Sequence, residues 1–130
     1  MYLIDANIVL EVLYKRGRWR KSYKLLNAVK KGSLSAYMLH FAVHGISAIL
    51  GKSSLVAKFL LELLTWKGLI VADLSLEEEQ TAAELAEKIG LDFDDGLHYY
   101  FAKRRNIPII SFDKDFDGTD IQRLEPHEVL

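Results

Sequence analysis

Short apolar runs alternate along this chain with stretches that carry a helical pattern, and this alternation constrains the fold more than any other feature. The apolar runs cover residues 2–4, 34–37, 69–71, 108–112 and 121–124. Helical patterns occupy the segments between them: 7–14, 19–31, 39–50, 54–66, 76–89 and from Asp92 or Asp94 to about Asn106. Strands that alternate with helices favour an α/β fold with a mostly parallel sheet, here as one domain over residues 1–130.

Composition limits the classes of function without choosing among them. Half of the 130 residues are hydrophobic and 27% are charged, so the chain can bury one real core. The formal net charge of -1 gives no global attraction to nucleic acid, so any basic surface must be local. The absence of cysteine excludes disulfides and thiolate metal sites. The amino terminus does not resemble a signal peptide and no segment looks membrane-spanning, so a cytoplasmic protein without a membrane partner is expected.

Three aspartates far apart in the sequence have positions that can bring them together. Asp5 closes the first apolar run, Asp113 closes the run 108–112, and Asp95 lies at the start of a predicted helix. Ligands of open parallel sheets gather outside the carboxyl ends of the strands, so these carboxylates can converge on one crevice. Clustered carboxylates repel one another, and a divalent cation is the usual reason to tolerate that. The pattern predicts a metal-dependent hydrolase of phosphodiesters, although each aspartate alone has a plainer explanation as a helix cap or turn residue.

Two other patterns suggest metals less strongly. Residues 113–118, DKDFDG, match the opening of a calcium-binding loop, but a strand precedes them and the required glutamate falls one residue late, at Glu125. His40 and His44 have the helical spacing of a zinc-binding pair, without a third ligand nearby. We expect no calcium loop here, and the two histidines are better explained by packing or solvent exposure.

One concentrated basic stretch has an aromatic residue inside it. Cations that neutralise phosphates, together with a ring that stacks on a base, suit single-stranded nucleic acid. The alternative, equally compatible with the pattern, is a solvated helix face with the tryptophan turned into the core. A second, weaker patch of the same kind is Lys103, Arg104 and Arg105. The predicted nucleic-acid-binding residues are Arg16, Arg18, Trp19, Arg20 and Lys21.

Three segments stand in this order along the chain: LIDANIV at 3–9, DFDDGL at 92–97 and IISFDKDF at 109–116. On these segments the chain resembles, over nearly its whole length, the PIN domain family, and within it the small VapC-type toxin ribonucleases. The resemblance implies a five-stranded parallel sheet flanked by helices, with Mg²⁺ or Mn²⁺ held at its carboxyl edge. It also implies an antitoxin protein as partner.

The resemblance assigns roles to individual residues. Asp5 and Asp95 correspond to the metal-binding aspartates and Asp113 to the acidic residue after the fourth strand, so these three are the predicted catalytic residues. The family usually has a glutamate in the helix after the second strand, whereas this chain has no acidic residue from Leu34 to Leu61 and its best match is His44. The predicted auxiliary site residues are Asn7, His44, Asp92, Asp94, Ser111 and Asp115.

The leading hypothesis is therefore a metal-dependent endoribonuclease. Its rival is a PIN-fold protein that has lost nuclease activity and binds RNA or a protein partner. A third reading is an interaction protein whose acidic residues are all caps. A homodimer is also expected, because one predicted helix and the residues after it have more large apolar side chains than one face can bury: Leu55, Phe59, Leu60, Leu63, Leu64 and Trp66.

Overall fold

The structure, a computed structural model of residues 1–130, is built on five parallel strands. The strands run in the order β3-β2-β1-β4-β5, and every neighbouring pair is parallel. This confirms the α/β domain with a five-stranded parallel sheet. The strand bounds are β1 Tyr2–Ile4, β2 Ala36–Leu39, β3 Leu69–Ala72, β4 Ile109–Ile110 and β5 Arg123–Leu124.

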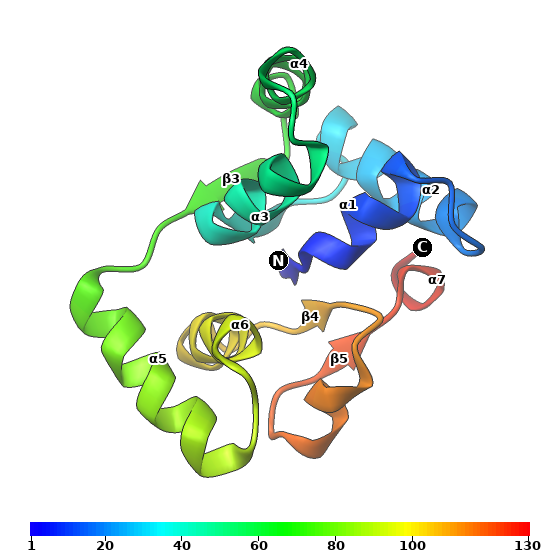
Figure 1. Ribbon diagram of the computed structural model, residues 1–130. Helices are drawn as coiled ribbons and strands as arrows, with labels where there is room; N and C mark the ends of the chain where they lie inside the picture. The colour runs from blue at the N-terminus through cyan, green and yellow to red at the C-terminus, as the bar shows by residue number, and fades with distance from the viewer.

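Helices cover both faces of the sheet (Figure 1). One face carries α1 Ala6–Leu13, α2 Trp19–Lys31, α3 His40–Leu50 and α4 Ser53–Leu64. The other face carries α5 Leu76–Ile89 and α6 Phe93–Arg105. The chain ends with a 3₁₀ helix over Lys114–Gly118, then β5, then the short helix α7 Pro126–Val129 against α2. No helix combines the length and the apolar character needed to cross a bilayer.

The second strand begins two residues later than its sequence indicates. The backbone N–H groups of Ser33 and Leu34 both donate to the carbonyl of Ala28, so these residues close the end of α2 and cannot enter the sheet. Gly68 packs into the same corner, and a Cβ there would lie 2.0 Å from the carbonyl oxygen of Leu34 and 2.8 Å from that of Val29. Only glycine therefore fits where the chain enters β3.

Helix α6 packs directly on the sheet face that α5 and α6 cover. Its residues from Gly96 to Ala102 are all buried between the sheet and α5. A Cβ at Gly96 would lie 2.6 Å from that of Ala86 on α5, so the close approach of the two helices requires the missing side chain. This packing fixes the amino end of α6, where Asp95 lies.

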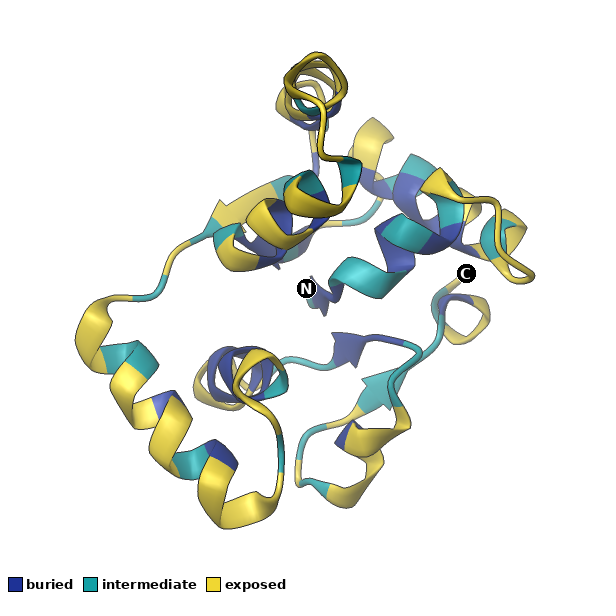
Figure 2. Cartoon of the chain, in the orientation of Figure 1, coloured by how far each residue is buried: buried dark blue, intermediate teal, exposed yellow.

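Helix α4 stands out from the body of the molecule (Figure 1), and most of its ribbon is exposed (Figure 2). Only Phe59 and Leu63 are buried within the chain, whereas the side chains of Leu61 and Leu64 are 66% and 83% exposed. The helix ends at Leu64, two residues earlier than expected.

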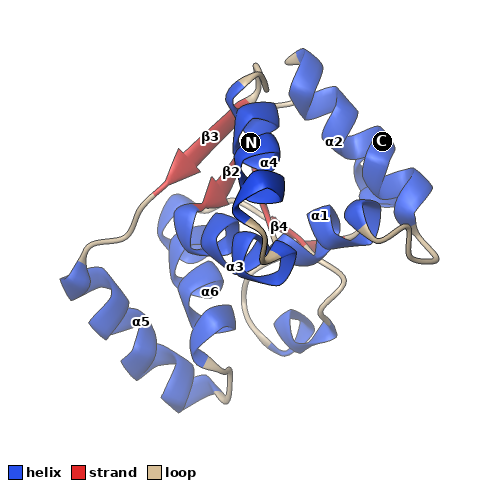
Figure 3. Ribbon diagram, turned by 45° about the horizontal axis from the view of Figure 1, so that its top comes forward, coloured by secondary structure: helices blue, strands red, loops and turns tan.

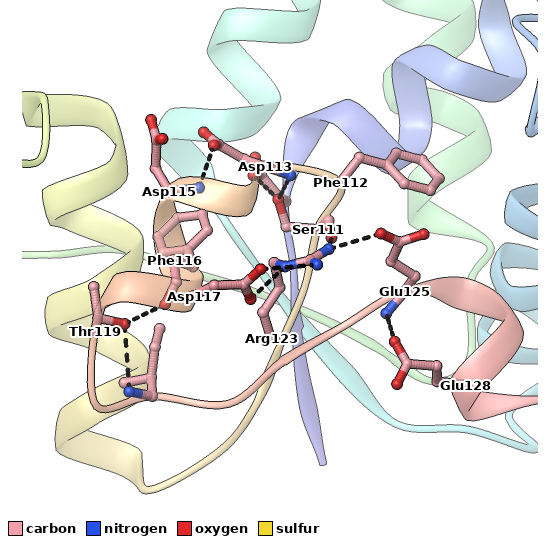
Figure 4. A network of polar contacts seen from close by, with 12 residues as sticks. Ser111, Phe112, Asp113, Asp115, Phe116, Asp117, Thr119, Arg123, Glu125 and Glu128 are labelled. Carbon is pink, nitrogen blue, oxygen red and sulfur yellow. Dashed lines mark hydrogen bonds and ion pairs between the residues drawn. The ribbon is translucent and has the colours of Figure 1, made fainter.

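The carboxyl-terminal region is more irregular than its sequence pattern predicts. The predicted strand 108–112 is reduced to two residues in β4, and the 3₁₀ helix and α7 had no periodic signal of their own. Asp113 caps the 3₁₀ helix by accepting a hydrogen bond from the Asp115 N–H, and Asp117 pairs with Arg123 (Figure 4). These bonds give residues 113–118 the form of a capped 3₁₀ turn.

Candidate metal and active site

The strand order reverses between β1 and β4, and open α/β sheets bind ligands at such a switch point, outside the carboxyl ends of the strands. Asp5 directly follows β1 and Asp113 lies three residues after β4. Asp95 comes from the first turn of α6. All three line one cleft of about 300 Å³, together with Asn7, Asp92, Asp94 and His98. The structure therefore brings together the three aspartates that the sequence singled out.

A hydrogen-bond network holds Asp5 in place. The buried Ser111 hydroxyl donates to Asp5 Oδ2 at 2.7 Å. Ser111 Oγ itself accepts from Asn7 Nδ2 at 3.1 Å and from the Asp113 backbone N–H at 2.9 Å. Asn7 Oδ1 in turn accepts from the Phe112 N–H at 3.3 Å. Asn7 and Ser111 thus tie the turn after β1 to the turn after β4, which aligns the carboxylates that follow both strands.

Asp95 is the group whose electrostatic surroundings are most unusual. Its backbone N–H is capped by Asp92 Oδ1 at 2.9 Å, which fixes the start of α6. Burial, then a hydrogen bond to Asp113 and the charges of Asp113, Asp92 and Asp5, raise the pKa of Asp95 to about 8. A carboxyl group that is this reluctant to ionise indicates a site in which negative charge is crowded.

A hard divalent cation fits this donor set. Asp95, Asp113 and Asp115 can each direct one carboxylate oxygen so that all three lie within 4.8 Å of one another. Carboxylate oxygens are the ligands that Mg²⁺ and Mn²⁺ prefer, and a cation would remove the repulsion that raises the pKa of Asp95. The Asp5 carboxylate lies outside this group of three, on the Ser111 side of the cleft.

His98 lies in the wall of the cleft and was not among the predicted site residues. It is buried, and its Nδ1 donates to the carbonyl of Asp94 at 3.0 Å. Its Nε2 is buried without a partner. Because a carbonyl oxygen only accepts, the bond to Asp94 requires a proton on Nδ1.

The α3 wall of the cleft carries no charge. Phe41, Ala42, Gly45 and Ile49 line it, and a Cβ added at Gly45 would meet no atom within 4 Å. The predicted auxiliary residue His44 is not brought to the cleft: it is exposed and lies against His40, with ring centroids 4.4 Å apart. His40 Nδ1 in turn lies 3.2 Å from the exposed carboxylate of Asp73.

The basic stretch covers the exposed turn between α1 and α2 and the first residues of α2, and only some of its cations are free of ion pairs. Arg18 pairs with Glu11 and Glu125 at 3.8 and 3.6 Å, and its guanidinium stacks 3.7 Å from the centre of the Phe112 ring, next to Asp113. Trp19 is only partly buried and lies between Lys15 and Arg20, at 5.9 and 4.8 Å. Arg16 and Lys21 are also exposed, and neither makes an ion pair.

Sequence reasoning missed the network that supports the loop after β4 (Figure 4). Arg123 is nearly buried, donates to both carboxylate oxygens of Asp117 at 2.8 and 3.2 Å, and also donates to Glu125 and to the carbonyl of Ser111. These bonds raise the pKa of Arg123 and lower the pKa values of Asp117 and Glu125. The only available signal was an arginine inside a weak strand pattern with acidic residues on either side.

Comparison with known proteins places the chain in a recognised family. The PIN domain family profile matches residues 2–122, so the chain belongs to the PIN domain family. None of the curated proteins matches the sequence significantly.

Solved structures with the same fold include a toxin–antitoxin complex from Klebsiella pneumoniae, with a TM-score of 0.76 and 16% identity, covering 97% of this chain and 98% of that one. VapC20 from Mycobacterium tuberculosis, described as a sarcin–ricin loop cleaving toxin, has a TM-score of 0.73 and 11% identity, covering 93% and 96%. VapBC2 from Rickettsia felis, bound to a promoter DNA fragment, has a TM-score of 0.67 and 16% identity, covering 95% and 97%. At these identities the likeness establishes the fold.

Proposed function

We propose that this protein is a metal-dependent endoribonuclease and the toxin of a toxin–antitoxin pair. The observation that carries the proposal is the convergence of Asp5, Asp95 and Asp113 on one cleft, with the pKa of Asp95 raised to about 8. The relatedness to a toxin that cleaves the sarcin–ricin loop and to toxin–antitoxin complexes supports RNA as substrate and an antitoxin as partner.

Each residue has a part in this proposal. Asp95, Asp113 and Asp115 would hold Mg²⁺ or Mn²⁺, with Asp5 completing the acidic cluster or orienting the attacking water. The bound ion would supply a Lewis acid that lowers the pKa of a water molecule and stabilises charge on the phosphate. Ser111 and Asn7 would keep Asp5 in position. RNA would approach over the turn before α2 and the start of that helix, where Arg16, Trp19, Arg20 and Lys21 lie. Arg18, which stacks on Phe112, would hold the segment next to Asp113 in place.

The test is cleavage of a 5′-labelled RNA by metal-free protein to which Mn²⁺ or Mg²⁺ is returned. We expect cleavage that EDTA abolishes and that Asp5→Asn and Asp113→Asn reduce by about 10²-fold or more, as for groups that act on the transition state. Glu87→Gln is the matched control, because this glutamate is exposed on α5 and lies outside the cleft. Equal cleavage by Asp5→Asn and the wild type would refute the assignment.

The uncharged α3 wall favours one second candidate, a PIN-fold protein that binds RNA without cutting it. The α3 wall lacks the carboxylate that PIN domains usually direct into the site from this helix. RNA binding without cleavage at any Mn²⁺ concentration would support this candidate over the nuclease.

We also propose that the chain forms a homodimer through α4. Leu55, Leu60, Leu61 and Leu64 are exposed on this protruding helix, and exposed apolar patches of this kind mark interaction surfaces. Light scattering should give twice the monomer mass for the wild type and the monomer mass for Leu61→Glu/Leu64→Glu. A monomeric wild type would contradict the proposal.

A further inference from the structure

A second cavity, of about 630 Å³, lies away from the acidic cleft and shares no lining residue with it. It is formed by β2, the loop after β3, and the helices α5 and α6, which lie beside one another in Figure 3. Asp95 and Arg105 are ten residues apart on α6, so the cavity opens about 15 Å along the helix from the cleft. Its volume is in the range of pockets that bind small molecules, roughly 300–1,000 Å³.

Two guanidinium groups without carboxylate partners lie in this cavity. Arg104 and Arg105 both line it, and neither has a carboxylate oxygen within 4.0 Å. The contrast with the other arginines is clear, because Arg18 and Arg123 each pair with two acidic side chains. The cavity thus holds two cationic groups that form no ion pair within the chain, although the carboxylates of Asp73 and Glu78 also line it.

Aromatic side chains hold both guanidinium groups in place. The Arg105 guanidinium lies 4.9 Å from the centre of the Tyr37 ring and 4.8 Å from that of Phe101, and donates to the Tyr37 hydroxyl at 3.2 Å. The Arg104 guanidinium lies 5.6 Å from the centre of the Tyr100 ring and donates to its hydroxyl at 3.0 Å. Each group has only one N–H committed to a tyrosine, so the other N–H groups remain available to bind an anion. Guanidinium groups oriented in advance lose less entropy when they bind.

Two carboxylates at the rim are occupied elsewhere. Glu78 accepts the Ser75 N–H in the capping box of α5, and this bond, helped by the charges of Arg104 and Arg105, lowers its pKa. Asp73 lies against His40. Basic residues at the end of α6 also suit the helix dipole. The dipole explains why cations occur on this turn, but it does not explain two of them sharing one cavity with three aromatic rings.

We propose that this cavity is a binding site for a phosphorylated nucleotide. The free N–H groups of Arg104 and Arg105 match the oxygens of a phosphate, which arginine recognises in bidentate fashion. The guanidinium planes and the apolar wall formed by Leu74, Phe101 and Ile107 offer contact for a base. The nucleotide is either a free mononucleotide or one unit of an RNA chain, since both present the same phosphate and base.

The test measures binding by isothermal titration calorimetry in EDTA, so that no metal in the acidic cleft contributes. The probes are AMP and UMP, a hexamer of RNA, adenosine and inorganic phosphate. Arg104→Gln and Arg105→Gln remove the charges, and Tyr37→Phe removes the hydroxyl that orients Arg105 while keeping the ring. Lys103→Gln is the matched control, because Lys103 lies on the same turn but pairs with Asp120 outside the cavity.

We expect saturable binding of a mononucleotide or of the hexamer, weakened about tenfold by each arginine variant because hydrogen bonds to charged groups are lost. Tyr37→Phe should weaken it less, and Lys103→Gln should leave it unchanged. Binding of mononucleotides identifies a free nucleotide, and binding of the hexamer alone identifies an RNA chain. No binding of either probe, an equal loss in Lys103→Gln, or binding of phosphate as tight as that of AMP would overturn the proposal. Since no residue of the acidic cleft takes part, this result is separate from any result on RNA cleavage.

Discussion

Replacing Asp95 with asparagine is expected to stabilise the metal-free protein in alkaline solution. Burial and the neighbouring carboxylates raise the pKa of Asp95 from 3.8 to about 8 in the folded chain. In the unfolded chain the group ionises at its ordinary pKa, about 3.9. The stability contributed by the neutral carboxyl is therefore fully present below pH ~4 and is lost as the pH rises through the folded-state pKa. An asparagine does not ionise, so the variant keeps this stability.

The size of the effect follows from the exposure of the group. At about 1.4 kcal/mol for each pKa unit, a fully buried carboxyl with this shift would change the free energy of unfolding by roughly 6 kcal/mol. Asp95 is only half-buried, and solvent screens its repulsion, so we expect roughly 1–2 kcal/mol. For a chain of this size that corresponds to a rise in Tm of about 3–8 °C.

The assay is thermal unfolding in EDTA, followed by circular dichroism at pH 5 and pH 9. Asp94→Asn is the control, because Asp94 lies exposed in the same first turn and its charge is not among those that raise the pKa of Asp95, whereas it does interact favourably with the helix dipole. Asp95→Asn should exceed the wild type in Tm at pH 9 by more than at pH 5, whereas Asp94→Asn should not exceed it at either pH. If Asp95→Asn unfolds below the wild type at pH 9, the carboxylates do not repel one another as described.

Five further variants test the packing and the cleft. Ser111→Ala should lower the free energy of unfolding by about 1–3 kcal/mol in urea titrations, because the buried Asp5 loses its donor. Gly96→Ala should cost about 1–3 kcal/mol in the same assay, since its Cβ would lie 2.6 Å from that of Ala86, whereas Gly45→Ala meets no atom and should gain up to about 1 kcal/mol. Gly45→Glu should tighten Mn²⁺ binding about tenfold in calorimetry by adding a carboxylate to the α3 wall, and His44→Glu should not.

Specific results would contradict the expected effects of these variants. Unchanged stability of Ser111→Ala would mean that the hydroxyl does not hold Asp5. Equal stabilities of Gly96→Ala and Gly45→Ala would mean that α5 and α6 are not in close contact. Tighter Mn²⁺ binding by His44→Glu than by Gly45→Glu would mean that α3 presents a different face to the cleft.

The helices and strands whose apolar residues recur at regular spacing could be predicted from the sequence. Most of the residues that line the cleft could be predicted with them. Asp5 and Asp113 follow apolar runs too short and too continuous to be helices, and any parallel arrangement of those runs places both residues at one edge. Asp95 lies in the first turn of α6 whether Asp92 or Asp94 caps the helix, and the structure shows that Asp92 does. Convergence of the three therefore required only local patterns and one rule of sheet topology.

The remaining features depend on contacts between distant parts of the chain. Helix α3 begins directly after β2, and this phase turns Ala42 and Gly45 toward the cleft and His44 away from it, a rotation that no spacing in the sequence reveals. Arg18 has the composition of a phosphate-binding residue, but Glu11 and Glu125 engage it through tertiary contacts. The leucines of α4 could be assigned to a helix from their spacing. The spacing does not reveal which of the apolar side chains pack within the chain and which remain exposed.

The most direct test of the central claim is an anomalous difference map from crystals of the protein grown with Mn²⁺. The claim is that the cleft after β1 and β4 binds a divalent cation for phosphodiester hydrolysis. It predicts a strong peak in contact with the carboxylates of Asp95 and Asp113, absent from crystals of Asp95→Asn. An ordered cleft without a peak, or a single peak beside His40 and His44, would contradict it.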